Sequence, residues 1–242
     1  MLNIIIPMAG RGSRFIDAGY PVPKPFIDVA GKPMIVRVMD NLAYPDAHFI
    51  LVARQEHLDA EIAIVEQIAA NYRVSFIGVD ALTEGTACTV LHARSLINTD
   101  DPLLIANSDQ IVDIPMSEYI DDCFNRQLDG SILTFCDPHR DPKWLFARID
   151  TNNKVMEVRE KVPISDFATV GLYLYTRGSD FVNSAVDMIV RNDRVNGEFY
   201  TCPTYNYAIK SGLSIGIFNI DYSKMHGLGT PEDLANYLDL YV

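Results

Sequence analysis

Residues 2–15 of the chain read LNIIIPMAGRGSRF, and this stretch decides the fold. Its first five residues are almost wholly apolar and rich in isoleucine, which is typical of a strand buried on both faces of a parallel sheet. The glycine-rich segment after Pro7 then leaves the carboxyl end of a central strand. Ligands of open α/β sheets bind at that edge, because backbone amides are free there to point into a crevice.

The glycine-rich segment has the composition of an anion-binding loop. Gly10 and Gly12 let a ligand approach the backbone closely, and Arg11 and Arg14 add positive charge. Neither of the two common phosphate loops fits, because Phe15 stands where a dinucleotide fingerprint has its third glycine and no Gly-Lys-Ser/Thr follows. A sharp turn with solvated arginines is the alternative interpretation of these residues alone.

Length and composition predict one domain that spans residues 1–242. At 242 residues and 48% hydrophobic content the chain can bury a large core. Its formal net charge of −12 argues against nucleic acid as a partner, since no cluster of lysine and arginine is visible. No segment has the length of a membrane span or the pattern of a secretory signal. We therefore expect neither a nucleic-acid nor a membrane partner.

The cysteines add a prediction about the cellular compartment. Cys88, Cys123, Cys136 and Cys202 are far apart in the sequence and include no Cys-x-x-Cys pair. This spacing predicts neither a zinc site nor a thioredoxin motif. Reduced thiols in the cytoplasm are the simplest interpretation.

Strand and helix patterns alternate through the first half of the chain. The expected strands are 2–6, 48–53, 74–79, 102–107 and 131–136, and the expected helices are 33–43, 55–71, 86–97 and 117–127. In the second half we expect strands at 146–150, 154–159, 167–176 and 213–219, and helices at 179–191, 198–211 and 231–241. Turn residues at 150–153 favour an antiparallel hairpin. The pattern predicts an α/β fold with a doubly wound, mostly parallel mixed sheet and a small antiparallel addition.

Two further charged residues are expected near the same edge of the sheet. Lys24 lies between Pro23 and Pro25, so a stiff loop presents its ammonium group. Asp109 ends an apolar strand pattern, a position where a carboxylate can hold a hard cation that bridges phosphates. A solvated lysine and a helix cap are the alternative roles of these two side chains.

With these residues in place, the chain resembles the sugar-phosphate nucleotidyltransferases. The shared motifs are residues 10–14, Lys24-Pro25, Asp109, residues 160–163, residues 168–173, residues 196–198 and residues 229–231. The resemblance covers nearly the whole chain and extends to a branch associated with capsule and surface polysaccharides. It implies a Rossmann-like fold with a nucleotide-binding half, about 1–136, and an acceptor-binding half, about 137–242.

The resemblance also implies roles for individual residues. The nucleotide would be bound by Ala9, Gly10, Arg11, Gly12, Ser13, Gly85 and Thr86. The acceptor pocket would contain Glu160, Lys161, Gly171, Asn196 and Glu198. Among the catalytic residues, Arg14 would bind the outgoing pyrophosphate and Lys24 would neutralise the transferred phosphoryl group. Lys161 would bind the acceptor phosphate, and Asp109 would hold the metal.

The implied reaction transfers a nucleoside monophosphate from a nucleoside triphosphate to a phosphorylated acceptor, a sugar 1-phosphate in the leading interpretation. Pyrophosphate is released, and the product would serve surface-polysaccharide synthesis. No protein nucleophile is needed, because an oxygen of the acceptor phosphate attacks the α-phosphorus. Mg²⁺ held by Asp109 would stabilise the developing charge. A homodimer is a further expectation.

One position departs from the family pattern. Many members of the family carry an aspartate as a second metal ligand in an Asp-x-Gly-Thr run, and the matching run here begins at Gly227. By sequence, His226 is the nearest candidate to replace it. Imidazole is a poor ligand for magnesium, so a packed or capping histidine is the favoured role.

The sequence does not identify the substrates, and it leaves alternative functions to consider. UTP, dTTP and CTP are all candidates, and a cytidylyltransferase acting on a non-sugar acceptor fits the same motifs. Aromatic rings could then bind a cationic acceptor through their faces, at Trp144, Phe146, Tyr173 and Tyr200. A non-catalytic subunit that senses nucleotides would explain why glycine stands at position 227 in place of the second metal ligand. An NAD-linked oxidoreductase is disfavoured, because the third glycine is absent and no crossover helix is expected directly after the glycine loop.

Overall fold

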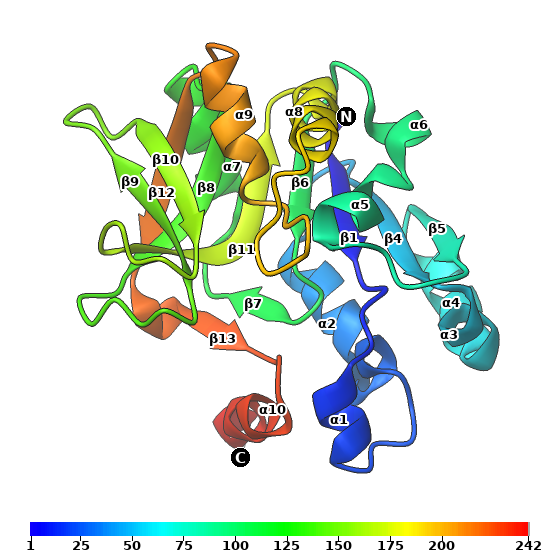
Figure 1. Ribbon diagram of the computed structural model, residues 1–242. Coiled ribbons are helices and arrows are strands. Elements are labelled where there is room, and N and C mark those ends of the chain that lie inside the picture. Colours follow the sequence, from blue (N-terminus) through cyan, green and yellow to red (C-terminus); the bar gives the residue numbers. More distant parts are fainter. Residues whose placement is uncertain (242) are drawn as a thin grey trace.

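The computed structural model describes residues 1–241. A nine-stranded mixed sheet lies at its centre, with helices on both faces (Figure 1). Seven strands follow the order β10-β9-β11-β6-β1-β4-β5, and β8 and β12 extend the sheet from β11. Their bounds are β1 Asn3–Pro7, β4 His48–Arg54, β5 Val74–Val79, β6 Leu103–Ala106, β8 Gly130–Cys136, β9 Leu145–Ile149, β10 Val155–Glu160, β11 Phe167–Tyr175 and β12 Ile215–Ile220.

The directions of the strands create the binding edge. β1 pairs in parallel with β4 on one side and with β6 on the other, and β4 pairs in parallel with β5. The carboxyl ends of these strands therefore meet at one edge, where the glycine loop begins. β11 runs antiparallel to both β6 and β8, so strands of both halves of the chain share one sheet. The predicted doubly wound sheet with an antiparallel addition is confirmed.

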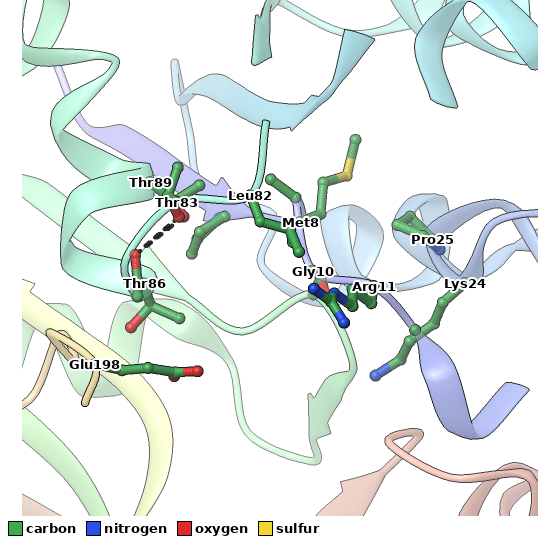
Figure 2. Close-up of a pocket in the computed structure, with 15 residues that line it drawn as sticks. Met8, Gly10, Arg11, Lys24, Pro25, Leu82, Thr83, Thr86, Thr89 and Glu198 are labelled. Atoms are coloured by element: carbon green, nitrogen blue, oxygen red, sulfur yellow. Dashed lines mark hydrogen bonds between the residues drawn. The ribbon is translucent and has the colours of Figure 1, made fainter. Parts of the chain in front are cut away.

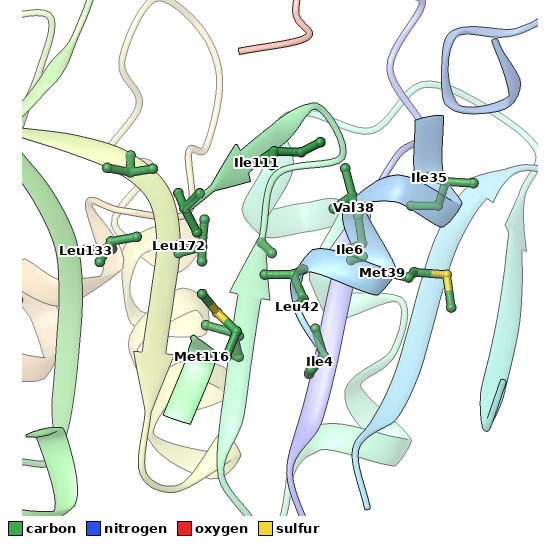
Figure 3. Packing of buried hydrophobic residues seen from close by; sticks show 14 of the residues in the cluster. Ile4, Ile6, Ile35, Val38, Met39, Leu42, Ile111, Met116, Leu133 and Leu172 are labelled. Carbon is green, nitrogen blue, oxygen red and sulfur yellow. The ribbon is translucent and has the colours of Figure 1, made fainter. Parts of the chain in front are cut away.

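Both faces of the sheet are buried, as the apolar run of β1 predicts. Ile4 and Ile6 pack in one layer with Val38 of α2 (Figure 3). Ile5 belongs to the opposite layer. This alternation follows from the two-residue repeat of a strand. One layer contains α2 (Met34–Asn41), α3 (Gln55–Ala60), α4 (Ile62–Asn71), α7 (Met116–Asn125) and α10 (Pro231–Leu238). The other contains α5 (Thr86–Leu91), α6 (Arg94–Ile97), α8 (Gly178–Val190) and α9 (Thr204–Lys210).

Three expected helices differ from the structure. The single helices expected at 55–71 and 86–97 are each divided, into α3 and α4 and into α5 and α6. The helix expected at 198–211 begins only at Thr204. Asn196 and Gly197 have positive φ angles and form the tip of a hairpin bridged between Val195 and Glu198, so the chain is not helical there.

Several short elements were not expected. The five-residue helix α1 (Ser13–Asp17) directly follows the glycine loop. A 3-10 turn, η1 (Lys24–Phe26), carries Lys24. Two small antiparallel sheets join β7 (Gln110–Val112) to β13 (Met225–Gly227) and β2 (Asp28–Val29) to β3 (Lys32–Pro33). The remaining 3-10 turns are η2 (Tyr222–Lys224) and η3 (Asp239–Tyr241).

Two further predictions concern the chemistry and environment of the chain. All four cysteines are free thiols. None of the helices within residues 1–241 combines the length and the apolar character that crossing a bilayer requires.

Candidate active site

A cavity of about 570 Å³ opens beside the glycine loop at the carboxyl edge of the sheet (Figure 2). Most of the predicted nucleotide-binding residues line it, namely Ala9, Gly10, Arg11, Gly12, Gly85 and Thr86. Sequence reasoning missed other lining residues, among them Met8, Leu82, Thr83 and Thr89. We refer to this space as the glycine-loop cavity.

The wall of the glycine-loop cavity opposite the glycine loop is held in place by the hairpin at 195–198. Phe199, which follows this hairpin, donates from its N to Glu84 O at 2.8 Å, and Ala87 N donates to Phe199 O at 2.9 Å. Gly85 lies between these two hydrogen bonds with a φ of 125°. A Cβ atom at this position would lie 2.4 Å from the carbonyl oxygen of Phe199, which is backbone and cannot move aside. Both the conformation and the close approach therefore require glycine.

Gly85→Ala is expected to destabilise the fold by about 2 kcal/mol or more, because the new methyl group must displace the backbone at Phe199. Nucleotide affinity should fall with it, since Gly85 lines the glycine-loop cavity. Thermal unfolding and nucleotide titration measure the two effects. Gly212→Ala is the matched control: its φ of 90° is also positive, but no atom lies within 4 Å of the added Cβ. Equal losses in both variants would leave only backbone strain as the cause.

A second cavity, of about 240 Å³, adjoins the glycine-loop cavity at Lys24, and we call it the Arg14 cavity. It is lined by Gly12, Ser13, Arg14, Phe15, Lys24 and Gly229. Ser13 and Arg14, predicted to bind the triphosphate and the leaving pyrophosphate, are thus next to the glycine-loop cavity but outside it. Lys24 lines both cavities and places its ammonium group between them.

Lys24 and Asp109 are brought together by the fold. The Nζ atom of Lys24 forms an ion pair with Oδ2 of Asp109, although 85 residues separate them in the sequence. Their side chains are 17% and 25% exposed, so water screens the pair only partly. The carbonyl oxygen of Asp109 also accepts a hydrogen bond of 2.7 Å from Leu228 N, which ties it to the carboxyl-terminal segment.

A second carboxylate lies close to Asp109. A Cβ atom on Gly229 would be 3.3 Å from Oδ2 of Asp109 and 3.7 Å from Oδ2 of Asp233, so both oxygens flank the same small space. Asp233 also accepts a 2.7 Å hydrogen bond from Thr230 Oγ1, as part of the cap of α10. No group of three or more His, Cys, Asp or Glu within residues 1–241 could hold a metal. Two carboxylates nevertheless fit Mg²⁺, which commonly takes its remaining ligands from phosphates and water.

His226 is engaged elsewhere. Its Nε2 atom lies 2.7 Å from Oδ2 of Asp113, and its ring lies 5.7 Å from that of Tyr237. This arrangement is that of a packed histidine. Asp233, which the sequence reasoning did not consider as a ligand, lies close to the position of the missing aspartate, since a Cβ on Gly227 would meet its carboxyl carbon at 3.9 Å.

A third cavity, of about 310 Å³, adjoins the glycine-loop cavity through Thr86, which lines both. Glu160 and Gly171, two of the predicted acceptor-binding residues, line it together with Asn107, Gln110, Lys143, Trp144, Thr169, Tyr173 and Tyr200. Gly171 lies where the pairing of β11 with β8 is irregular, and its carbonyl oxygen accepts a 3.0 Å hydrogen bond from Asn107 N. We call this space the acceptor cavity.

The acceptor cavity contains a carboxyl group with an unusual pKa. Burial raises the pKa of Glu160 above its ordinary value, and the nearby charge of Glu198 adds to the rise while Lys161 opposes it. The pKa of Tyr200 is raised to about 12, first by burial and then by Glu198 and Glu160. Glu198 itself lines the glycine-loop cavity, so it lies at the boundary between nucleotide and acceptor.

Two of the predicted acceptor-binding residues, Lys161 and Asn196, do not line the acceptor cavity. The Nζ atom of Lys161 lies 6.0 Å from the ring centre of Tyr200, which lines the acceptor cavity, but Lys161 does not line the cavity itself. Asn196 lines a separate cavity, next to Arg194 and Arg159. Its positive φ at the hairpin tip gives Asn196 a turn-forming role, and the Asn-Gly pair is the sequence signal for that role.

Comparison with known proteins assigns this arrangement to a family. The model of the nucleotidyl transferase family matches residues 3–200, which is most of the chain. The chain belongs to the nucleotidyl transferase family. The resemblance inferred from the glycine loop, Lys24 and Asp109 is thereby confirmed at the level of the family.

Individual members of the family extend the comparison. The chain is 23% identical to the bifunctional protein GlmU of Methanococcus aeolicus over 81% of its own length and 49% of that protein. It is 27% identical to a mannose-1-phosphate guanyltransferase of Aspergillus oryzae over 48% of its length and 33% of that protein. The chain thus spans half or less of these curated relatives. A nucleoside-diphosphate-sugar pyrophosphorylase of Vibrio cholerae, 25% identical, superposes with a TM-score of 0.83 over 98% of this chain and 99% of that one.

Proposed function

We propose that the protein transfers a nucleoside monophosphate from a nucleoside triphosphate to a sugar 1-phosphate and releases pyrophosphate. The observation that carries this proposal is the arrangement of the three cavities. The glycine-loop cavity shares Lys24 with the Arg14 cavity on one side and Thr86 with the acceptor cavity on the other. A leaving pyrophosphate, a nucleotide and an acceptor can thus occupy adjoining cavities in that order. The relatives of the chain, which include a mannose-1-phosphate guanyltransferase, support the same reaction class.

The reaction is a displacement at the α-phosphorus. An oxygen of the acceptor phosphate forms the new bond to phosphorus, and the bond to the pyrophosphate oxygen breaks on the opposite side. The chain needs no nucleophile of its own, so its contribution is positioning and charge stabilisation. Backbone amides of the glycine loop would bind the triphosphate, and Arg14 would receive the pyrophosphate in its own cavity. Lys24, between the two cavities, would lie beside the bond that breaks.

Asp109 is the residue that we propose for binding Mg²⁺, with Asp233 as the second carboxylate in place of the aspartate missing at position 227. The metal would supply Lewis-acid stabilisation of the charge that develops on the phosphate oxygens. Lys24 neutralises Asp109 in the structure described here. The same ammonium could serve a phosphate group once another cation balances Asp109.

The acceptor cavity favours a phosphorylated acceptor whose other groups are uncharged hydroxyls over one that carries a cationic group. Binding of a cation by aromatic rings requires open ring faces. Here Lys143 Nζ lies 4.9 Å from the ring centre of Trp144, and Lys161 Nζ lies 6.0 Å from that of Tyr200. The two ring faces thus already have an ammonium group of the protein's own. Phe146, also considered for this role, is fully buried in the core.

The proposal is tested with a panel of nucleoside triphosphates against hexose 1-phosphates and phosphocholine, with Mg²⁺ and detection of pyrophosphate. We expect turnover with at least one hexose 1-phosphate and none with phosphocholine. Turnover with phosphocholine alone would favour the cytidylyltransferase alternative. Nucleotide binding without turnover on any acceptor would favour the nucleotide-sensing subunit. Cytoplasmic location, pairing of two copies and a place in surface-polysaccharide synthesis are further parts of the proposal.

Lys161→Ala is expected to weaken binding of the sugar phosphate by about 1.5–3 kcal/mol and to leave nucleotide affinity nearly unchanged. The range is that of a hydrogen bond to a charged group, and the ammonium near Tyr200 lies on the acceptor side of the site. Calorimetric titration of each substrate separately measures both affinities. Lys154→Ala is a control from the same hairpin. A large loss of nucleotide affinity in Lys161→Ala would show that we have divided the site wrongly.

A further inference from the structure

Gln110 has a buried amide group without a hydrogen-bond partner. The residue follows Asp109 directly, begins β7 and is 8% exposed. Its Nε2 atom is buried, and no acceptor within residues 1–241 receives a hydrogen bond from it. A buried N–H that makes no hydrogen bond destabilises the protein that contains it. Such a group calls for an explanation in terms of what it binds.

The position of Gln110 suggests that explanation. Four other residues within 1–241 carry a buried side-chain atom without a partner, namely Arg54, His57, Ser131 and Ser214. Gln110 differs from them because it lines the acceptor cavity. A neighbouring polar group in that cavity is already satisfied, since Thr169 Oγ1 and Tyr173 OH are 3.3 Å apart. Gln110 thus lines the cavity that an acceptor would enter, and no group within residues 1–241 forms a hydrogen bond with its Nε2 atom.

We propose that Gln110 is a specificity-determining residue that forms a hydrogen bond with a hydroxyl group of the acceptor. This inference rests on the proposed function, because it assumes that the acceptor occupies this cavity. A hydroxyl fits the lining of this cavity, since its two charged residues, Lys143 and Glu160, have opposite signs and together do not favour an anion. A hydroxyl can donate and accept at once, so it matches either end of the amide and can also donate to Glu160.

The proposal predicts opposite effects on stability and on acceptor use when the amide is removed. Methionine has nearly the length of glutamine and no N–H group. Gln110→Met should raise the melting temperature of the substrate-free protein by about 2–4 °C, because an unsatisfied buried polar group is lost. The same variant should lower kcat/KM for the preferred hexose 1-phosphate about 10- to 100-fold. The KM for the nucleoside triphosphate should stay within about twofold of its wild-type value.

Deoxy analogues of the preferred hexose 1-phosphate identify the hydroxyl. With the wild type, one deoxy analogue should have a kcat/KM lower than that of the parent sugar phosphate by about the factor that Gln110→Met causes with the parent. With Gln110→Met, the kcat/KM of that analogue should equal that of the parent. Gln67→Met, at an exposed glutamine of α4, is the control for the substitution and should change neither property. A fall in melting temperature with unchanged discrimination among the sugar phosphates would make Gln110 a structural residue and overturn the inference.

The two proposals can fail separately. If the wild type uses no hexose 1-phosphate at all, the proposed function fails. The melting temperature of Gln110→Met then still tests whether the Gln110 amide lacks a hydrogen bond in the free protein. A melting temperature equal to or below that of the wild type would refute this part of the inference. If hexose 1-phosphates are used and every deoxy analogue responds to Gln110→Met as the parent sugar does, only the inference about Gln110 is refuted.

Discussion

Lys24→Ala is expected to lower kcat about 10²- to 10³-fold, while the KM for the nucleoside triphosphate rises by less than tenfold. Lys24 lines both the glycine-loop cavity and the Arg14 cavity, so its ammonium group lies where the α-phosphate and the pyrophosphate would separate. Negative charge grows there as the bond breaks. A group that stabilises this charge acts more strongly on the transition state than on the bound substrate. Steady-state rates of pyrophosphate release at varied nucleotide concentration measure both constants.

Two further variants make this prediction specific. Lys32→Ala removes another lysine that is ion-paired with an aspartate, Asp40, but that lies outside the three cavities, and it should leave both constants unchanged. Lys24→Arg keeps the charge and should retain more activity than Lys24→Ala. If Lys24→Ala changes only KM, Lys24 is a binding residue and does not stabilise the transition state.

The fold was predictable where local pattern and tertiary structure agree. Apolar runs such as residues 48–53 became central strands, since a strand buried on both faces leaves an unbroken hydrophobic signal. β7 and β13 have only three residues each and pair across 115 positions of sequence, which leaves no local period to detect. The start of one helix was predicted wrongly for a different reason. At residues 196 and 197 a turn with positive φ outweighed the helical spacing of the residues that follow.

The candidate site was predictable in part, for a related reason. The glycine loop and Asp109 directly follow strand patterns, so parallel topology alone brings them to one edge of the sheet. Asp233 and Gln110 carry no such signal. Asp233 reaches the site because the carboxyl-terminal segment returns to the sheet edge. The pairing of β7 with β13 and the hydrogen bond from Leu228 N to Asp109 O hold that segment there. Gln110 is notable only for its burial without a partner, which a sequence does not reveal.

Asp109→Asn is expected to lower turnover at least about 10²-fold while the protein stays folded. Asparagine has the shape of aspartate, and its carbonyl oxygen can still accept a hydrogen bond from Lys24. The melting temperature should therefore change little. What the variant loses is the negative charge that attracts a divalent cation, so half-maximal activity should require a higher Mg²⁺ concentration. Mg²⁺ titrations of activity, with circular dichroism as a test of folding, measure both effects.

Matched variants separate a metal ligand from a structural carboxylate. Asp113→Asn changes a nearby aspartate that pairs with His226 and is 62% exposed, and we expect its Mg²⁺ dependence to be that of the wild type. Asp233→Asn should raise the Mg²⁺ requirement by a smaller factor than Asp109→Asn, because Asp233 would be the second ligand and its Oδ2 atom already accepts a hydrogen bond from Thr230 Oγ1. Near-normal activity of Asp109→Asn at low Mg²⁺ would remove Asp109 from the metal site and leave only its ion pair with Lys24. If Asp233→Asn lowers the melting temperature without changing the Mg²⁺ requirement, the hydrogen bond from Thr230 Oγ1 is the whole function of the Asp233 side chain, and Asp233 does not replace the aspartate missing at position 227.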